Sequence, residues 1–176
     1  MECDLGRYNA NAMNKRLFIY LKKIVLNSLW VCFLISFFSQ IQAQERILRY
    51  HPDGEDFVIV NGNKKFNRAL YGTHSAFRIE TGDVPELGFF MPNMGGNMQF
   101  GLMATNKSLW LNNAQRIESR YRPGTRIYRI TDPFLQSGEL IITVLAMSDA
   151  EGMIACIETK NIPKEIVLLT TFGGAG

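Results

Sequence analysis

Cysteine and histidine are scarce in this sequence of 176 residues, which holds three cysteines and two histidines. Only Cys156 lies after residue 43, so the main part of the chain cannot form an internal disulfide. No second cysteine and no pair of histidines stands at the spacing of metal ligands, so we expect no metal site. Cys156 lies in an apolar run, which predicts a small, buried hydrophobic residue.

The sequence also lacks an excess of one charge once its first 43 residues are set aside. Five of the 19 Lys and Arg residues and two of the 16 Asp and Glu residues fall in that segment, so residues 44–176 carry 14 of each sign. A neutral domain argues against nucleic acid as a partner, because that binding depends mainly on clustered Lys and Arg. Residues 44–176 are numerous enough for one domain with its own core.

Known catalytic signatures are missing as well. The sequence contains no Gly-x-Ser-x-Gly elbow, no His-Glu-x-x-His motif and no phosphate-binding loop. His51 and His74 each fall in a turn-like run, where a lone histidine is more often a local hydrogen-bonding group than a base. Nothing in the pattern indicates which two carboxylates could face one glycosidic bond. We therefore assign no catalytic residue and no cofactor.

The first 43 residues have the pattern of a secretory signal peptide. Met13 opens a basic segment, residues 24–38 are mainly apolar, and a short polar stretch ends at Ala43. We predict cleavage after Ala43, export to the periplasm or the cell exterior, and no stable membrane insertion afterwards. Residues 1–12 are interpreted as an upstream start-site artefact. The alternative is a retained membrane anchor, although the apolar stretch is shorter than the ~20 residues of a spanning helix.

Residues 44–176 have the pattern of an antiparallel β-sandwich. Their 14 glycines and 6 prolines are spread along the chain and leave little room for a helix of average length. Residues 140–147 are apolar at successive positions, as expected of a central strand that is covered on both sides. Strand-like runs recur with turn signals between them, which is typical of a sandwich, at residues 57–60, 77–81, 86–91, 98–103, 125–131, 140–147, 153–159 and 165–172.

Three local patterns carry more specific expectations. Asn61-Gly62 follows a run of strand-forming residues and is typical of a tight hairpin. The glycine cluster of residues 92–97 is expected to form a wide connection between strands, with a ligand-binding loop as the alternative. The stretch from Leu109 to Arg122 fits both helical and strand periodicity, and we favour a strand because its neighbours are strands.

Three longer stretches are distinctive: residues 67–102 (NRALYGTHSAFRIETGDVPELGFFMPNMGGNMQFGL), 121–146 (YRPGTRIYRITDPFLQSGELIITVLA) and 168–176 (LLTTFGGAG). Together they resemble the N-terminal part of large exported Bacteroidetes proteins that form a domain-of-unknown-function family, family 4450. The resemblance implies a supersandwich-like β-sandwich followed by an (α/α)6 barrel, as in several glycoside hydrolase families, within polysaccharide utilisation. Because the family's chains continue beyond this point, we expect this chain to be a truncated piece, incomplete at its C-terminus.

The resemblance implies an accessory function. The sandwich would be the N-terminal domain of a carbohydrate-active, glycoside-hydrolase-like protein and would not be catalytic by itself. It would pack on a downstream (α/α)6 domain and lend loops to a site for a polysaccharide or oligosaccharide, with Tyr71, His74, Asn93 and Asn97 as glycan contacts. The alternative is a free-standing glycan-binding module. A small enzyme with a carboxylate pair in the sandwich is least favoured, because no motif supports it.

Overall fold

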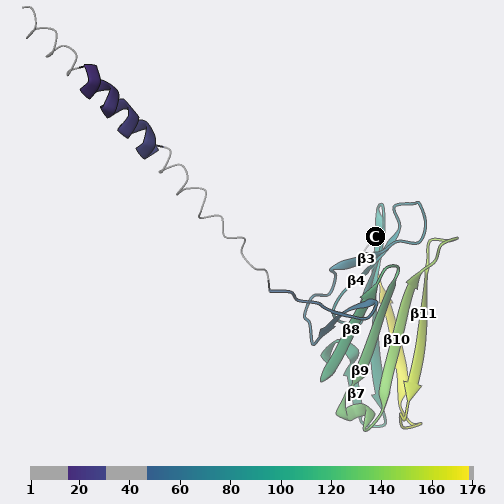
Figure 1. Cartoon of the computed structure of the whole chain (residues 1–176). Helices are drawn as coiled ribbons and strands as arrows, with labels where there is room; N and C mark the ends of the chain where they lie inside the picture. Colours follow the sequence, from purple (N-terminus) through teal and green to yellow (C-terminus); the bar gives the residue numbers. More distant parts are fainter. Residues whose placement is uncertain (1–15, 31–46, 175–176) are drawn as a thin grey trace, which may run out of the picture. The chain divides into compact units, whose positions relative to one another are not determined.

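The computed structural model of the chain describes residues 16–30 and 47–174. The chain divides into two compact units, Met1–Ile47 and Leu48–Gly176. In the first unit, residues 16–30 form a helix (Figure 1). The side chains of this helix are exposed. No helix within the described ranges is long and apolar enough to cross a membrane. The cleavage predicted after Ala43 lies outside the described residues and stays a prediction.

The second unit is a sandwich of two antiparallel sheets (Figure 1). The first sheet has the strand order β1-β2-β8-β9-β10-β11, formed by β1 (His51–Asp53), β2 (Asp56–Val60), β8 (Arg116–Arg122), β9 (Thr125–Thr131), β10 (Glu139–Ala146) and β11 (Met153–Lys160). The second has the order β12-β6-β5-β4-β3, formed by β12 (Val167–Gly173), β6 (Met94–Ala104), β5 (Glu86–Met91), β4 (Arg78–Thr81) and β3 (Arg68–Leu70), with β7 (Lys107–Trp110) also paired to β6. The predicted all-β sandwich is confirmed.

Apolar side chains at alternating strand positions form the core between the sheets. Side chains point to opposite faces of a strand in turn, so each strand contributes every second residue to the core. Burial of one large apolar side chain contributes about 1.5–3 kcal/mol, and the core contains many of them. The buried apolar residues of the strands are Leu70, Ile79, Leu87, Phe100, Leu102, Ile117, Tyr128, Ile130, Leu140, Ile142 and Val144, with Ile141 buried on the opposite face of β10.

The stretch from Leu109 to Arg122 contains no α-helix, so the favoured strand interpretation is confirmed. It begins within β7, continues through the single 3-10 turn η1 (Leu111–Asn113), and ends as β8. Leu111 is fully buried within that turn, and Ile117 is buried on β8. Two strands joined by a short turn place apolar residues at spacings that resemble those of a helix.

The hairpin predicted at Asn61-Gly62 is wrong. The strand after β2 is β3, which lies in the other sheet, and β2 pairs instead with β1 and β8. Asn61 has a left-handed φ of 51°, its Oδ1 accepts a hydrogen bond from the Ile117 backbone N–H at 2.8 Å, and its Nδ2 donates to the Gln115 carbonyl. Asn61 therefore ends β2 and holds that end to β8 by hydrogen bonds. After it the chain crosses to the second sheet, whereas a hairpin would have kept both strands in the same sheet.

The wide connection predicted for residues 92–97 is also wrong. Met91 pairs with Met94, so Pro92 and Asn93 alone join β5 to β6. Asn93 has a φ of 64°, and proline followed by a residue with positive φ is typical of a tight type II turn. Gly96 lies within β6, where the ring of Phe172 of β12 packs closely over it. A Cβ at this position would overlap with that ring, which explains why the residue is a glycine.

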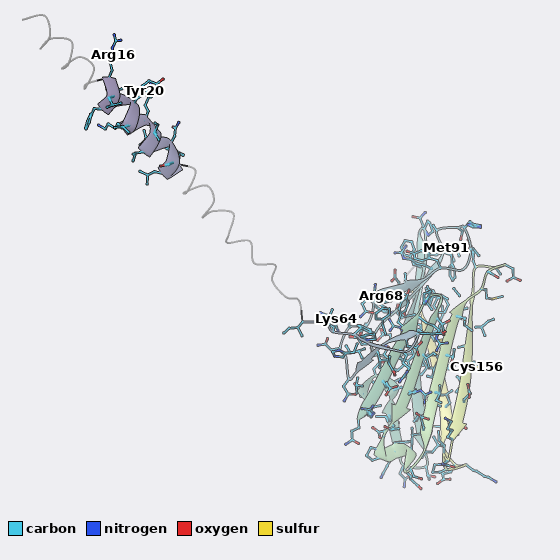
Figure 2. All side chains as sticks on the ribbon, in the orientation of Figure 1. Arg16, Tyr20, Lys64, Arg68, Met91 and Cys156 are labelled. Carbon is cyan, nitrogen blue, oxygen red and sulfur yellow. The ribbon has the colours of Figure 1, made fainter. Side chains whose placement is uncertain are left out.

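The prediction that Cys156 is buried is wrong too. Cys156 is exposed and lies on β11, an edge strand of the first sheet (Figure 2). It pairs with Thr143, while its neighbours Ala155 and Ile157 pair with the buried Val144 and Ile142. Strand alternation therefore turns Cys156 away from the core, which an apolar run alone does not reveal.

Candidate functional site

Three of the four predicted glycan contacts lie at one end of the second sheet. Arg78, the first residue of β4, pairs with Phe90 near the end of β5, so the β3–β4 loop and the β5–β6 turn lie at the same end. Tyr71 and His74 belong to that loop and are exposed, and Asn93 belongs to that turn and is exposed as well.

The β3–β4 loop also contacts the first sheet. A Cβ at Gly72 would overlap with the backbone oxygen of Met147, which follows directly after β10. Tyr71 is 63% exposed beside this contact. The loop is thus fixed against the β10–β11 connection, and the side chain of Tyr71 remains accessible to a partner.

Asn97 lies apart from that end, on the outer face of β6. Its Nδ2 donates to Oε1 of Glu86 at 3.3 Å, and Glu86 Oε2 accepts from Asn112 Nδ2 at 2.8 Å and pairs with Lys65 Nζ at 3.0 Å. Glu86 is only 2% exposed although it faces away from the core. The side-chain amide of Asn97 therefore helps to hold the buried carboxylate of Glu86 on the outer face.

A second buried carboxylate, Asp83, lies two residues after the end of β4 and has a fully buried side chain. Its Oδ1 accepts hydrogen bonds from the Tyr50 hydroxyl and from Asn67 Nδ2, the latter at 2.8 Å. Its Oδ2 accepts from Arg49 Nη2 at 2.5 Å and from the Lys64 backbone N–H at 2.9 Å. Four donors thus satisfy this carboxylate, and they come from segments far apart in the sequence.

Arg126 of β9 is fully buried and has no carboxylate partner among the described residues. Its Nε donates to Thr81 Oγ1 at 3.2 Å, and its Nη1 donates to Ser119 Oγ at 3.1 Å. Its remaining donors reach the Tyr50 hydroxyl and Asn67 Oδ1, both at 3.3 Å. Tyr50 and Asn67 also contact the buried carboxylate described above, so neutral groups link the two opposite charges.

Burial and the hydrogen bonds of this network shift the pKa values of Tyr50 and Asp83 in opposite directions. Burial raises the pKa of the Tyr50 hydroxyl, and its hydrogen bond to Asp83 raises that pKa further. Burial also acts to raise the pKa of Asp83, but the hydrogen bonds from Tyr50, Lys64, Asn67 and Arg49 outweigh it and lower the pKa. At neutral pH Tyr50 therefore donates and Asp83 is ionised, which fixes one arrangement of the network.

A cavity of about 430 Å³ adjoins this network, a volume in the usual range of small-molecule sites. Phe57 is 51% exposed at the cavity and Leu48 is 67% exposed, so its wall is partly apolar. Figure 2 shows Arg68 on the same side of the sandwich as Lys64. We call this cavity the Arg68 pocket; it is lined by Leu48, Arg49, Tyr50, Phe57, Asn67 and Arg68.

The chemistry of the Arg68 pocket is that of a binding site. Its lining provides guanidinium groups, one amide and aromatic rings, and the carboxylate beside it, Asp83, is already held by four donors. No group of three or more His, Cys, Asp or Glu side chains in the described part of the chain could hold a metal ion. The arrangement can hold a ligand by charge and by ring stacking.

The sequence interpretation missed the buried network and the pocket. Asp83 lies just beyond the strand-like run of residues 77–81, and no motif marks it, Arg49, Phe57 or Arg68. One signal was available. Arg126, Tyr128 and Ile130 stand at every second position of β9 and therefore share its core-facing side, so a charge was to be expected inside the core. Its partners come from distant segments, which a strand pattern does not reveal.

The comparisons with known proteins give one family. The sequence model of the family DUF4450, described as a domain of unknown function, matches residues 91–176. This match covers β6, β7 and all the later strands, and it supports the family assignment for that part of the chain. Comparison with curated proteins found no match, and comparison with solved structures found none either.

Proposed function

We propose that this chain is the N-terminal accessory β-sandwich of an exported, carbohydrate-active, glycoside-hydrolase-like protein. In this proposal the sandwich does not catalyse a reaction by itself; it packs on an (α/α)6 domain and contributes loops to a glycan site. Tyr71, His74 and Asn93 support this proposal because they are exposed at one end of the second sheet. Cleavage after Ala43 would deliver the domain to the periplasm or the cell exterior.

The observation that carries the packing proposal is an exposed apolar patch on the outer face of the second sheet. Leu169 of β12 and Trp110 of β7 both pair with Gly101 of β6, so they flank it on one row. Met103 and Val167 pair with each other on the next row of the same face. All four side chains are at least 36% exposed. We call Met103, Trp110, Val167 and Leu169 the outer apolar patch.

The edge of the same sheet supports the same proposal. Among the described strands, β12 pairs only with β6, so its other edge is open. The strand has the sequence VLLTTFG, which holds neither a charge nor a proline. Natural proteins usually protect such an edge with charge, with proline or with a covering element. An adjoining domain would cover both the edge and the outer apolar patch.

The experiment compares residues 44–176 alone with the same residues joined to the family's downstream region. We expect the shorter protein to bind a hydrophobic dye and the longer one to bind much less. Leu169→Lys should reduce dye binding by the shorter protein. Val60→Lys is the matched control, because Val60 is 42% exposed but lies on the other sheet. Equal dye binding by the two proteins would contradict the packing proposal.

The Arg68 pocket favours a second candidate, a free-standing glycan-binding module. A module of this kind would be a soluble monomer with a cooperative melt and micromolar affinity for a glycan. Isothermal titration of residues 44–176 with oligosaccharides distinguishes the two. The accessory domain is expected to bind weakly or not at all by itself, because most of its glycan site would be formed with the adjoining domain.

A further inference from the structure

We propose that the Arg68 pocket binds a carboxylate-bearing sugar, so that the glycan recognised by this protein contains uronate residues. The choice of a sugar as the ligand rests on the proposed function. The carboxylate and the apolar face that the ligand must carry follow from the residues of the pocket.

Arg68 supplies the free cation. Its guanidinium makes no hydrogen bond or ion pair with any residue in the described ranges, and it lies over the ring of Tyr121, at 5.4 Å from the centroid. Arg68 is also exposed. Such a guanidinium still has all its N–H donors available, in the planar geometry that matches a carboxylate.

The surroundings of the pocket leave a positive charge that no described residue neutralises. Arg49, Arg68 and Arg126 lie in the pocket or in the network beside it, whereas Asp83 is the single carboxylate of that network. Arg49 is 43% exposed, so it can reach a ligand while one of its nitrogens stays on Asp83. Residues 44–176 are neutral as a whole, so the excess positive charge is local to the pocket. It can attract a small anionic ligand to this site, whereas the domain as a whole does not attract polyanions.

The apolar wall selects among anions. Phe57 is half-exposed and Leu48 is more so, and a bare inorganic anion would gain nothing from either side chain. A pyranose ring has an apolar C–H face that packs on aromatic rings, and in a uronate this face stands beside a planar carboxylate. A cavity of about 430 Å³ accommodates one such ring with part of its neighbour.

The network beside the pocket keeps the site in one geometry. Tyr50 and Asn67 line the pocket, and each is also bonded to the buried pair of charges behind it. Their side chains therefore cannot rotate without breaking hydrogen bonds. A site whose residues are already ordered loses less entropy when it binds a ligand.

The test is an NMR titration of the full chain with trigalacturonate, with maltotriose as the neutral ligand and acetate as the bare carboxylate. We expect saturable shifts at the pocket residues with trigalacturonate, no shifts there with maltotriose, and at least tenfold weaker binding of acetate. Arg68→Ala should weaken trigalacturonate binding at least tenfold. Phe57→Ala should weaken it severalfold and is safe for folding because Phe57 is half-exposed.

Arg116→Ala is the matched control, since it removes the same charge from an exposed arginine on β8 outside the pocket. An equal loss of binding in Arg116→Ala would overturn the proposal and indicate non-specific attraction. Absent shifts at the pocket, equal binding of maltotriose there, or equal binding of acetate would each overturn it as well. Binding of maltotriose near Tyr71 and His74 without any uronate site would refute this inference and leave the proposed function standing.

Discussion

Replacement of Asp83 by asparagine tests the energetic role of the buried network. The carboxylate accepts two hydrogen bonds at each oxygen, from Tyr50 and Asn67 at one and from Arg49 and the Lys64 backbone at the other. An asparagine side chain has one oxygen and one NH2 group. In either orientation the NH2 group, itself a donor, would face two of the four donors. The substitution also removes the one negative charge of the network.

The expected loss follows from these contacts. Removal of one member of a buried charge pair typically costs about 3–5 kcal/mol. Domains of this size have total stabilities of about 5–15 kcal/mol, so Asp83→Asn should remove roughly a fifth or more of the total. The melting temperature should fall by roughly 10–20 °C. Urea denaturation of residues 44–176, followed by circular dichroism, measures the change in the free energy of unfolding.

The acid side of the stability curve gives a second measurement of the same substitution. The pKa of Asp83 is lower in the folded state than in the unfolded chain, so its contribution to stability is present above the unfolded pKa of ~4 and is lost as the pH falls through the folded pKa. Asp83→Asn should therefore reduce the loss of stability in acid. Glu80→Gln is the control, because Glu80 forms an ion pair with Arg78 on the outer face and should contribute less than ~1 kcal/mol. A change of under 1 kcal/mol in Asp83→Asn would refute the reasoning.

Three further predictions concern single positions. Gly82→Ala should destabilise the domain by about 1–3 kcal/mol, because a Cβ would overlap with two backbone oxygens. Gly173→Ala is the control and should be nearly neutral, since its Cβ would meet nothing within 4 Å. Thermal melts of the two variants compare their stabilities. Tyr128→Phe should cost about 1 kcal/mol through the lost hydrogen bond to the Gly82 carbonyl. Because burial raises the pKa of Tyr128, the native protein should lose stability above pH ~10, and a pH series of urea melts should show a smaller loss in Tyr128→Phe. Asn61→Ala should cost about 1–2 kcal/mol in the same melts, because it removes the acceptor of the Ile117 N–H, and an unchanged melt would contradict this account of the end of β2.

The fold class was predictable from the sequence because alternation and turn residues are local signals. β4 shows this well, since residues 77–81 (FRIET) alternate between core-facing and outward side chains and are followed by Gly82-Asp83. Connections between sheets were not predictable in the same way. Asn61-Gly62 has the composition of a hairpin turn, but the partner of Asn61 is Ile117 of β8, more than 50 residues away. Only the assembled sheet decides between the two outcomes.

The candidate site was predictable only in part. Tyr71, His74 and Asn93 could be placed in connections because polar and turn residues surround them, and the register of β4 with β5 then brings them to one end of the sheet. The Arg68 pocket depends on Leu48, Phe57 and Arg68, which meet only when β2 and β3 lie in opposite sheets. No periodicity in the sequence encodes that meeting.

Hydrogen–deuterium exchange of β12 tests the central claim most directly, namely that an adjoining domain covers this sandwich. In residues 44–176 alone, the backbone amides of residues 167–173 that do not pair with β6 should exchange rapidly, because that edge of the strand is open. In a protein that also contains the family's downstream region, the same amides should be protected at least tenfold more strongly. Equal exchange in the two proteins, together with tight glycan binding by residues 44–176 alone, would contradict the accessory-domain account and favour a free-standing binding module.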